Sequence, residues 1–172
     1  AVMDGNRRYP FLIRGQLSLV KDCYAETGRH SFATSGPVTN GPNVFLDCEA
    51  RMCYADAGPH ARLATATLYD NVTTYKVTAA EAIPGVNIDG DYVGAFLIID
   101  RDRMGPGHGW AEINGALWNC TTDGNTCVQR PPVSGNNYGV GCCGTDWEGH
   151  VVRPPGKKVS FGIPVTPRSL YE

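Results

Sequence analysis

Side chains suited to acid–base chemistry are most concentrated at residues 100–112, in the stretch DRDRMGPGHGWAE. Enzymes use carboxylates and imidazoles held in one loop as general acids and bases. If the protein is an enzyme, the sequence therefore predicts Asp100, Asp102, His108 and Glu112 as its catalytic residues.

Two other ligands suit the same stretch. Trp110 offers a flat ring on which a sugar can stack, while the neighbouring acids accept hydrogen bonds from its hydroxyls. A calcium ion would take oxygen ligands from Asp100, Asp102 and loop carbonyls. This interpretation is the weaker one, and we expect the protein to have no cofactor. A polar hairpin tip with an incidental histidine explains the stretch without any ligand.

A second stretch, TDWEGH at 145–150, repeats this chemistry. If a disulfide holds it near 100–112, the two loops would form a cleft that carries two tryptophans and several acids. Without such a contact, Trp147 simply covers an edge of the core. The ligand-binding residues predicted on this basis are Trp110, Trp147, Asp146 and Glu148.

The cysteines predict the compartment. Their spacing fits neither a zinc site nor a C-x-x-C redox centre, and two sequons mark Asn71 and Asn119 as glycosylation acceptors. These features predict a secreted, extracellular protein with three disulfides, in which the odd cysteine stays free or links two chains as a dimer. Six of the following seven would be paired: Cys23, Cys48, Cys53, Cys120, Cys127, Cys142 and Cys143. The alternative is an intracellular protein with buried free thiols.

Short stretches of alternating or continuous apolar residues, such as FLIRGQLSLV at 11–20 and YVGAFLIID at 92–100, predict strands separated by turns rich in the 21 glycines and 12 prolines. We expect about eight strands in a single all-β domain, 1–172, folded as an antiparallel β-sandwich or barrel, with at most one short helix near 78–83. No internal repeat is visible. A strand after the acidic cluster NIDGDY at 87–92 would place that cluster about 30 Å from Asp100, at the opposite end of the sheet.

Composition excludes two classes of partner. A formal net charge of −2 without a basic stripe argues against nucleic acid, and no apolar run approaches the roughly 20 residues of a membrane span. The sequence favours an extracellular binding module that recognises a glycan or protein through loops 100–112 and 145–150. The alternative is a small secreted enzyme, a hydrolase or other acid–base catalyst, with carboxylates and a histidine in a loop-lined cleft.

Overall fold

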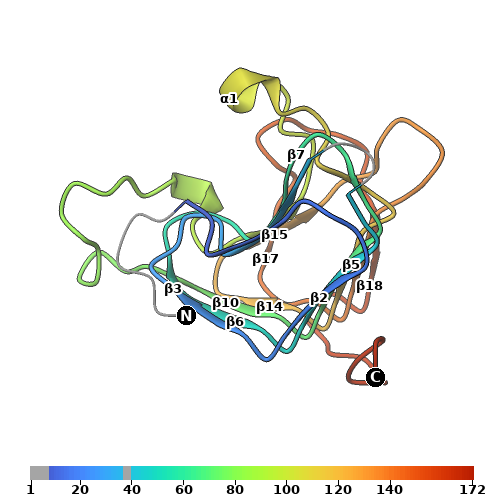
Figure 1. Cartoon of the computed structure of the whole chain (residues 1–172), viewed down its shortest axis with the longest axis horizontal. Coiled ribbons are helices and arrows are strands. Elements are labelled where there is room, and N and C mark those ends of the chain that lie inside the picture. Colours follow the sequence, from blue (N-terminus) through green and yellow to red (C-terminus); the bar gives the residue numbers. More distant parts are fainter. Residues whose placement is uncertain (1–7, 37–39) are drawn as a thin grey trace.

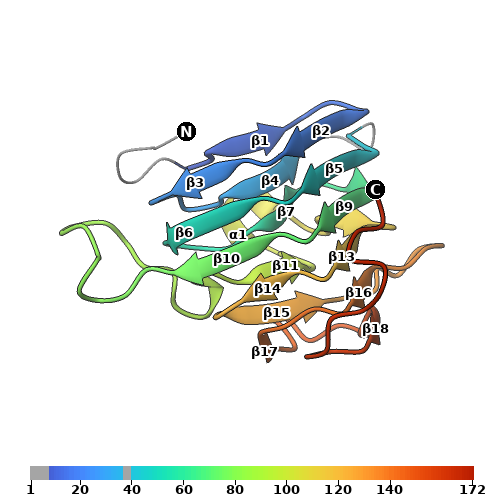
Figure 2. The same cartoon turned by 90° about the horizontal axis from the view of Figure 1, so that it is seen from below.

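The computed structural model describes residues 8–36 and 40–172, which wind into a three-sided parallel β-helix (Figure 1). Each coil contributes short strands to up to three sheets, and each strand pairs in parallel with those of the coils before and after it (Figure 2). Two short helices, η1 (Gly90–Tyr92) and α1 (Met104–Gly107), lie outside the coils.

Sheet A consists of β1 (Phe11–Ile13), β4 (Phe32–Ser35), β7 (Gly58–Ala61), β11 (Phe96–Ile98), β15 (Asn125–Val128) and β17 (Thr145–Asp146), and a parallel bridge from Ala57 to Phe96 joins its two halves. Sheet B consists of β2 (Ser18–Lys21), β5 (Asn43–Leu46), β9 (Thr67–Asp70), β13 (Ala116–Trp118), β16 (Tyr138–Val140) and β18 (Lys157–Val159). Sheet C consists of β3 (Tyr24–Glu26), β6 (Glu49–Cys53), β10 (Thr73–Lys76) and β14 (Thr121–Thr122). A small pair, β8 (Ala64–Thr65) and β12 (Glu112–Ile113), lies in the connections between sheets A and B.

This architecture contradicts the predicted antiparallel sandwich or barrel, and the described residues form eighteen short strands instead of about eight. The predicted strand at 11–20 is in fact β1, a corner and β2. Alternation between an inner and an outer face is the same whether neighbouring strands run parallel or antiparallel. The apolar pattern therefore located strand residues without revealing the direction of pairing.

The predicted helix near 78–83 is a single turn. Thr78 and Glu81 form half of a capping box: the backbone N–H of Thr78 donates to Glu81 Oε2 over 3.0 Å, but the Thr78 hydroxyl also donates to that oxygen, over 2.7 Å, and does not accept from the Glu81 N–H. The backbone N–H of Ile83 instead donates to the Tyr54 hydroxyl over 2.7 Å. Pro84 follows directly and has no backbone N–H, so the turn does not continue as a helix.

The corner between sheets B and C reveals a repeat that was missed in the sequence. Strand pairing places Asn43 against Ser18 and Thr67 against Asn43, so uninterrupted coils are 25 and 24 residues long (43 − 18 and 67 − 43). One corner residue per coil has a positive φ, and its backbone N–H donates to a carbonyl of the following coil. These corner residues are Asp22, Asp47, Asn71, Asn119 and Gly141.

Four cysteines directly follow these corner residues, at positions 23, 48, 120 and 142. The thiols of Cys48, Cys120 and Cys142 donate to backbone carbonyls of the preceding coil, at 3.5, 3.3 and 3.4 Å. All seven cysteines are free, so the predicted disulfide-stabilised fold is wrong. Stacked strands lie about 4.8 Å apart with parallel side chains, whereas a disulfide needs Cβ atoms that converge to about 3.8 Å.

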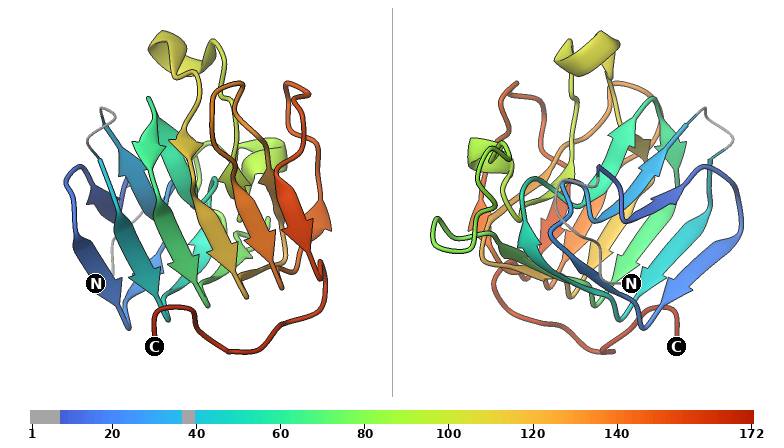
Figure 3. Two further views of the ribbon diagram at one scale, coloured as in Figure 1. Left: turned by 90° about the vertical axis from the view of Figure 1, so that its right-hand side faces the viewer. Right: turned by 60° about the vertical axis from the view of Figure 1, so that its left-hand side comes forward.

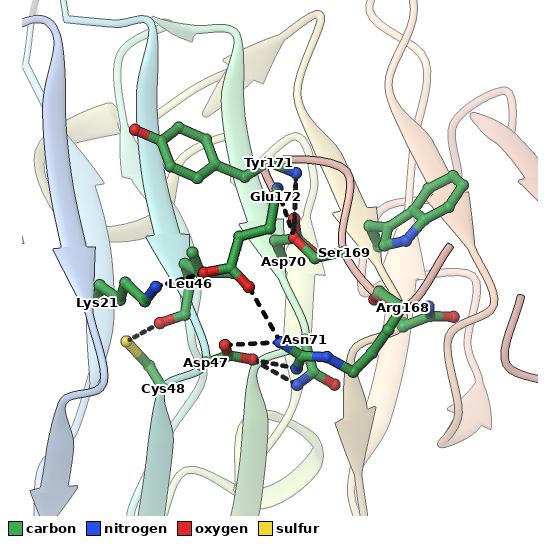
Figure 4. A network of polar contacts seen from close by, with 12 residues as sticks. Lys21, Leu46, Asp47, Cys48, Asp70, Asn71, Arg168, Ser169, Tyr171 and Glu172 are labelled. Carbon is green, nitrogen blue, oxygen red and sulfur yellow. Dashed lines mark hydrogen bonds and ion pairs between the residues drawn. The ribbon is translucent and has the colours of Figure 1, made fainter. Parts of the chain in front are cut away.

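The C-terminal segment, residues 160–172, runs back across the coils outside the corner between sheets B and C (Figure 3). The buried carboxylate of Asp70 accepts hydrogen bonds from the Ser169 hydroxyl and from the backbone N–H groups of Leu170 and Tyr171, over 2.7–2.9 Å (Figure 4). Ion pairs from Arg168 to Asp47 and from Lys21 to Glu172 add to this network. The segment thereby ties several coils together.

Two substitutions of Asn119 separate the contribution of the corner conformation to stability from that of the bonds to the C-terminal segment. Its φ is +48°, and its amide nitrogen donates to the carbonyls of Val165 and Arg168 over 2.9 and 3.0 Å. Asn119→Gly keeps the backbone conformation and loses these bonds, so we expect the free energy of unfolding to fall by about 1–3 kcal/mol. Asn119→Ala should cost about 1–2 kcal/mol more because Ala resists a positive φ. Urea denaturation measures both, and equal losses would contradict the role of the corner.

Thiol labelling tests the cysteine arrangement. Five of the seven cysteines are buried, while Cys23 and Cys143 are partly exposed. We expect a thiol reagent to modify at most two cysteines in the folded protein and all seven after unfolding without reductant. Mass spectrometry of the labelled protein counts them, and fewer than seven labels after unfolding would mean that disulfides are present.

Candidate functional site

A pocket of about 350 Å³ opens on the outer side of sheet A. In Figure 1, η1 (green) and α1 (yellow) stand on either side of the concave edge occupied by this sheet. Four side chains that are at most 5% exposed make its floor: His30, Asp56, His60 and Arg101. Its more exposed residues include Arg8, Arg29, Asp89, Tyr92, Met104 and His108. We call this site the histidine pocket.

Two insertions into the regular coil supply much of the lining of the pocket. Residues 77–95 follow β10 and carry η1, while residues 99–111 follow β11 and carry α1. Gly105 in α1 has a φ of +54°, and a Cβ atom there would lie 2.3 Å from Cε1 of His108. Glycine at 105 is thus what allows the His108 ring to lie against the backbone of α1.

His30, Asp56 and Arg101 form a buried polar group. His30 Nδ1 lies 2.9 Å from Asp56 Oδ1, and the Arg101 guanidinium pairs with the other oxygen of the same carboxylate. Arg101 is further fixed by hydrogen bonds from Nε and Nη2 to the carbonyl of Pro59, at 3.2 and 3.0 Å. Because an ionised carboxylate only accepts, His30 donates from Nδ1, and in the neutral ring Nε2 is then an acceptor. Nε2 forms no hydrogen bond with the described residues.

His60 lies between two other imidazoles. Its ring centroid is 4.2 Å from that of His30 and 4.7 Å from that of His108, and both of its ring nitrogens are buried without a hydrogen-bond partner in the described structure. Buried polar atoms are nearly always paired, so two unpaired nitrogens on one ring suggest that a ligand or ordered water completes them.

Electrostatics fix the protonation states of Asp56 and His60 near neutral pH. Burial opposes ionisation of Asp56, but the Arg101 guanidinium and the hydrogen-bonded His30 ring outweigh it and hold the pKa of this carboxyl well below its usual range. Burial first, and then the neighbouring His30 and Arg101 side chains, lower the pKa of His60 to about 2. Burial also lowers the pKa of His108. His60 is therefore a neutral ring beside an ionised carboxylate.

One of the three arginines that line the pocket has no acidic partner among the described residues. Arg101 pairs with Asp56, and Arg29 pairs with Asp89. Arg8 forms no ion pair with the described residues. With His60 neutral, the pocket favours an anionic ligand.

Tyr92 brings a hydroxyl group to the pocket. Its oxygen lies 2.7 Å from Nδ1 of His150, and burial raises its pKa to about 12, so the phenol stays protonated at neutral pH. Trp147 packs edge-on against its ring at a centroid distance of 5.5 Å. The fourth histidine of the chain thus contacts the same site through Tyr92.

One of the four predicted catalytic residues, His108, lies in the histidine pocket. Asp100 is buried, and its carboxylate is occupied by the backbone N–H of Asp102 and the guanidinium of Arg153, each at 2.8 Å. Asp102 is exposed, with a φ of +45°. Glu112 is fully buried and accepts hydrogen bonds from the backbone N–H and hydroxyl of Thr67 at 3.1 and 2.9 Å.

The predicted ligand-binding tryptophans line two separate hollows. Trp110 faces a hollow of about 520 Å³, and Trp147 a second one of about 480 Å³ together with Asp146 and Glu148. Arg153 borders both. The single cleft expected between loops 100–112 and 145–150 is therefore two neighbouring hollows, and no disulfide joins the loops.

The predicted separation of the two acidic clusters is wrong, because Asp89 and Tyr92 line the same pocket as Arg101 and His108. Strand β11 has only three residues and follows a bend at Gly94, where φ is +67°. The chain from 92 to 100 is therefore not the continuous extended strand that the apolar run predicted.

Sequence reasoning also missed His30, Asp56, His60, Tyr92 and Arg101 as site residues. The 24-residue repeat was the available signal. It would have placed His30 and Asp56 in adjacent coils, each two residues before a strand of sheet A, namely β4 and β7. Without the repeat, residues this far apart had no reason to be grouped.

The proposed acceptors Asn71 and Asn119 occupy corners of the β-helix. The Asn71 amide donates to Asp47 over 2.6 Å, and the Asn119 amide donates to the C-terminal segment. A glycan on either nitrogen would have to replace these bonds, so glycosylation and the secretion it suggested stay predictions.

Within residues 8–36 and 40–172, no group of three or more His, Cys, Asp or Glu side chains is arranged to hold a metal ion. The same residues include no helix long and apolar enough to cross a membrane.

Fold and site together define a three-sided parallel β-helix with a histidine pocket on the outer side of one sheet. Comparison with known proteins finds no matching family model, no matching curated protein and no matching solved structure. The residues of the histidine pocket are therefore the best indication of function.

The burial of the Glu112 carboxyl, which argues for a structural and not a catalytic role, can be tested through its titration. Burial raises its pKa from 4.5 to about 8, despite the hydrogen bonds from Thr67. The folded protein then holds one proton more than the unfolded chain between about pH 4.5 and 8, so stability falls as pH rises through this window. Glu112→Gln does not titrate, and its stability relative to wild type should rise with pH by up to about 1.4 kcal/mol per unit.

Urea denaturation of both proteins at several pH values between 5 and 8 measures this difference, and the remaining titrating groups cancel because both proteins share them. Parallel curves would show that the Glu112 carboxyl does not gain a proton on folding.

Proposed function

We propose that the chain is an enzyme that transfers protons in the histidine pocket, and that it acts on a saccharide bearing a carboxylate. The sequence favoured a binding module, with an acid–base enzyme as the alternative. The pocket supports the alternative, although its residues are mostly not those expected.

The observation that carries this proposal is the paired arrangement of His30 and His60. The carboxylate of Asp56 orients His30, leaving Nε2 as an acceptor, and the adjacent His60 ring has two buried nitrogens without partners. An imidazole whose tautomer is held by a buried carboxylate is an effective general base. A ring with unsatisfied buried nitrogens is costly for a purely structural core, because each unpaired group loses its hydration.

The acids of the pocket argue against hydrolysis by a carboxylate pair. A glycosidase of that kind needs two carboxyl groups free to act as acid and as base or nucleophile. Asp56 is engaged by Arg101 and His30, and Asp89 by Arg29 and by the Asn87 amide. The pocket therefore suits a reaction in which an imidazole, and not a carboxylate, removes the proton.

β-Elimination next to a carboxylate is such a reaction. Nε2 of His30 would take the proton from the carbon adjacent to the substrate carboxylate, a carbon–carbon double bond would form, and the bond to the leaving glycosidic oxygen would break. The Tyr92 hydroxyl would give its proton to that oxygen. The positive charge of Arg8, which forms no ion pair with the described residues, would stabilise the negative charge that builds up on the substrate.

Turnover of soluble uronate polymers tests the proposal. Polygalacturonate and polymannuronate, with a neutral glucan as comparator, would be followed by the ultraviolet absorbance of the unsaturated uronate that elimination leaves. We expect His30→Gln to lower kcat about 100- to 10,000-fold, as loss of a general base does. Asp102→Asn, which removes an exposed acid of the α1 loop, should leave turnover unchanged.

Circular dichroism and thermal unfolding would establish that both variants are folded. New reducing ends without unsaturated product would indicate hydrolysis and contradict the elimination. Full activity of a folded His30→Gln protein would exclude His30 as the base, and a folded wild-type protein inactive on every uronate polymer would overturn the proposal.

A further inference from the structure

The hollow that contains Trp110 lies outside the histidine pocket and is built from different parts of the chain. Trp110 comes from the end of the α1 loop, Arg130 and residues 131–135 from the loop that follows β15, and Arg153 from the segment before β18. The loop after β15 (orange) projects from the side of the β-helix in Figure 1. The hollow measures about 520 Å³, a volume within the range of small-ligand sites.

Trp110 is only partly buried, whereas the core encloses Phe32, Phe45, Tyr69 and Phe96. It has no ring partner among the described residues, and its indole N–H forms no hydrogen bond with them. The walls around it are Pro131, Pro132, Pro154 and Val133. A flat ring between rigid apolar walls is a surface on which the apolar face of a sugar can stack.

The charges that border the hollow have one sign. Arg130 is exposed and forms no ion pair with the described residues, and no acid lines the hollow. Arg153 forms an ion pair with Asp100, in which Nε and Nη2 of the arginine each lie 2.8 Å from the same carboxylate oxygen. In a chain with a net charge of −2, this concentration of positive charge favours an anionic ligand.

The same loop joins the hollow to the histidine pocket. His108 lines the pocket and Trp110 lines the hollow, and two residues of backbone span at most about 7 Å. An antiparallel bridge between Asp100 and Trp110 closes the base of this loop and fixes its exit. One extended ligand can therefore reach both sites.

We propose that the Trp110 hollow is a subsite that binds an acidic sugar unit of the polymer on which the histidine pocket acts. The inference deepens the proposed function and rests on it for the identity of the polymer. In this subsite, Trp110 stacks on the sugar ring and Arg130, which has no acidic partner among the described residues, binds its carboxylate.

Binding measurements test the subsite without requiring turnover. The probe is trigalacturonate, with its methyl ester as a neutral control of the same shape, titrated calorimetrically into the folded His30→Gln protein, where cleavage is slow. We expect Trp110→Ala to weaken trigalacturonate binding about tenfold and Trp110→Phe to retain most of it, because stacking energies of about 1.4 kcal/mol correspond to one factor of ten.

Arg130→Gln is the test of charge. It should weaken binding of trigalacturonate severalfold, leave binding of the methyl ester unchanged, and reduce the salt dependence of binding. Arg103→Gln is the matched control, because it removes an exposed arginine of the α1 loop that does not line the hollow.

The outcomes separate the two proposals. Trp110-dependent binding of trigalacturonate without turnover by wild type supports the subsite and contradicts the proposed reaction. Turnover of uronate polymers with an affinity that neither Trp110→Ala nor Arg130→Gln changes overturns the subsite and leaves the reaction standing. Equal affinity for the acid and its methyl ester overturns the recognition of a carboxylate.

Discussion

Backbone hydrogen bonding between successive coils is the constraint on which this structure depends. Every strand in sheets A, B and C pairs with the coils beside it, so the chain must turn at the same place in each coil. Corner residues with positive φ make this possible, and Asp and Asn tolerate that conformation better than most side chains. The thiols of the inner cysteines then donate to carbonyls of neighbouring coils. Regular stacking therefore replaces covalent cross-links as the stabilising framework.

The same constraint explains where a site can form. Residues inside the coils are committed to the core, as the stacked rings of Phe45 and Tyr69 illustrate at 5.0 Å. An insertion between strands does not disturb stacking as long as the chain returns to the next coil in register. The segments 77–95 and 99–111 do so, and both fold against the outer side of sheet A. The regular coils supply His30 and His60, and the insertions supply Tyr92 and His108.

A buried ion pair joins these two parts. Arg101 is the largest fully buried side chain of the described protein, and it links an insertion to Asp56 and Pro59 of the coils. Burying two charges carries a desolvation cost that their attraction only partly offsets, so such a pair is weak support for stability. It does orient His30 through the shared carboxylate. The contribution of the Asp56–Arg101 pair to the site is therefore the fixed position of the His30 imidazole.

The sequence by itself determined that the protein is mostly β, and it located many strand residues, because alternation of apolar and polar side chains depends only on which face is buried. It also singled out His108, Trp110 and Trp147, each of which borders a pocket or hollow. Only the tertiary structure decided that the strands are parallel, that the cysteines are free and that His30, Asp56 and Arg101 meet. Those facts depend on the stacking of coils, and two insertions interrupted the 24-residue period that would have revealed it. Asp56 is 26 positions from His30 and 45 positions from Arg101. Their contacts depend on which coils are adjacent, and local side-chain patterns do not reveal that order.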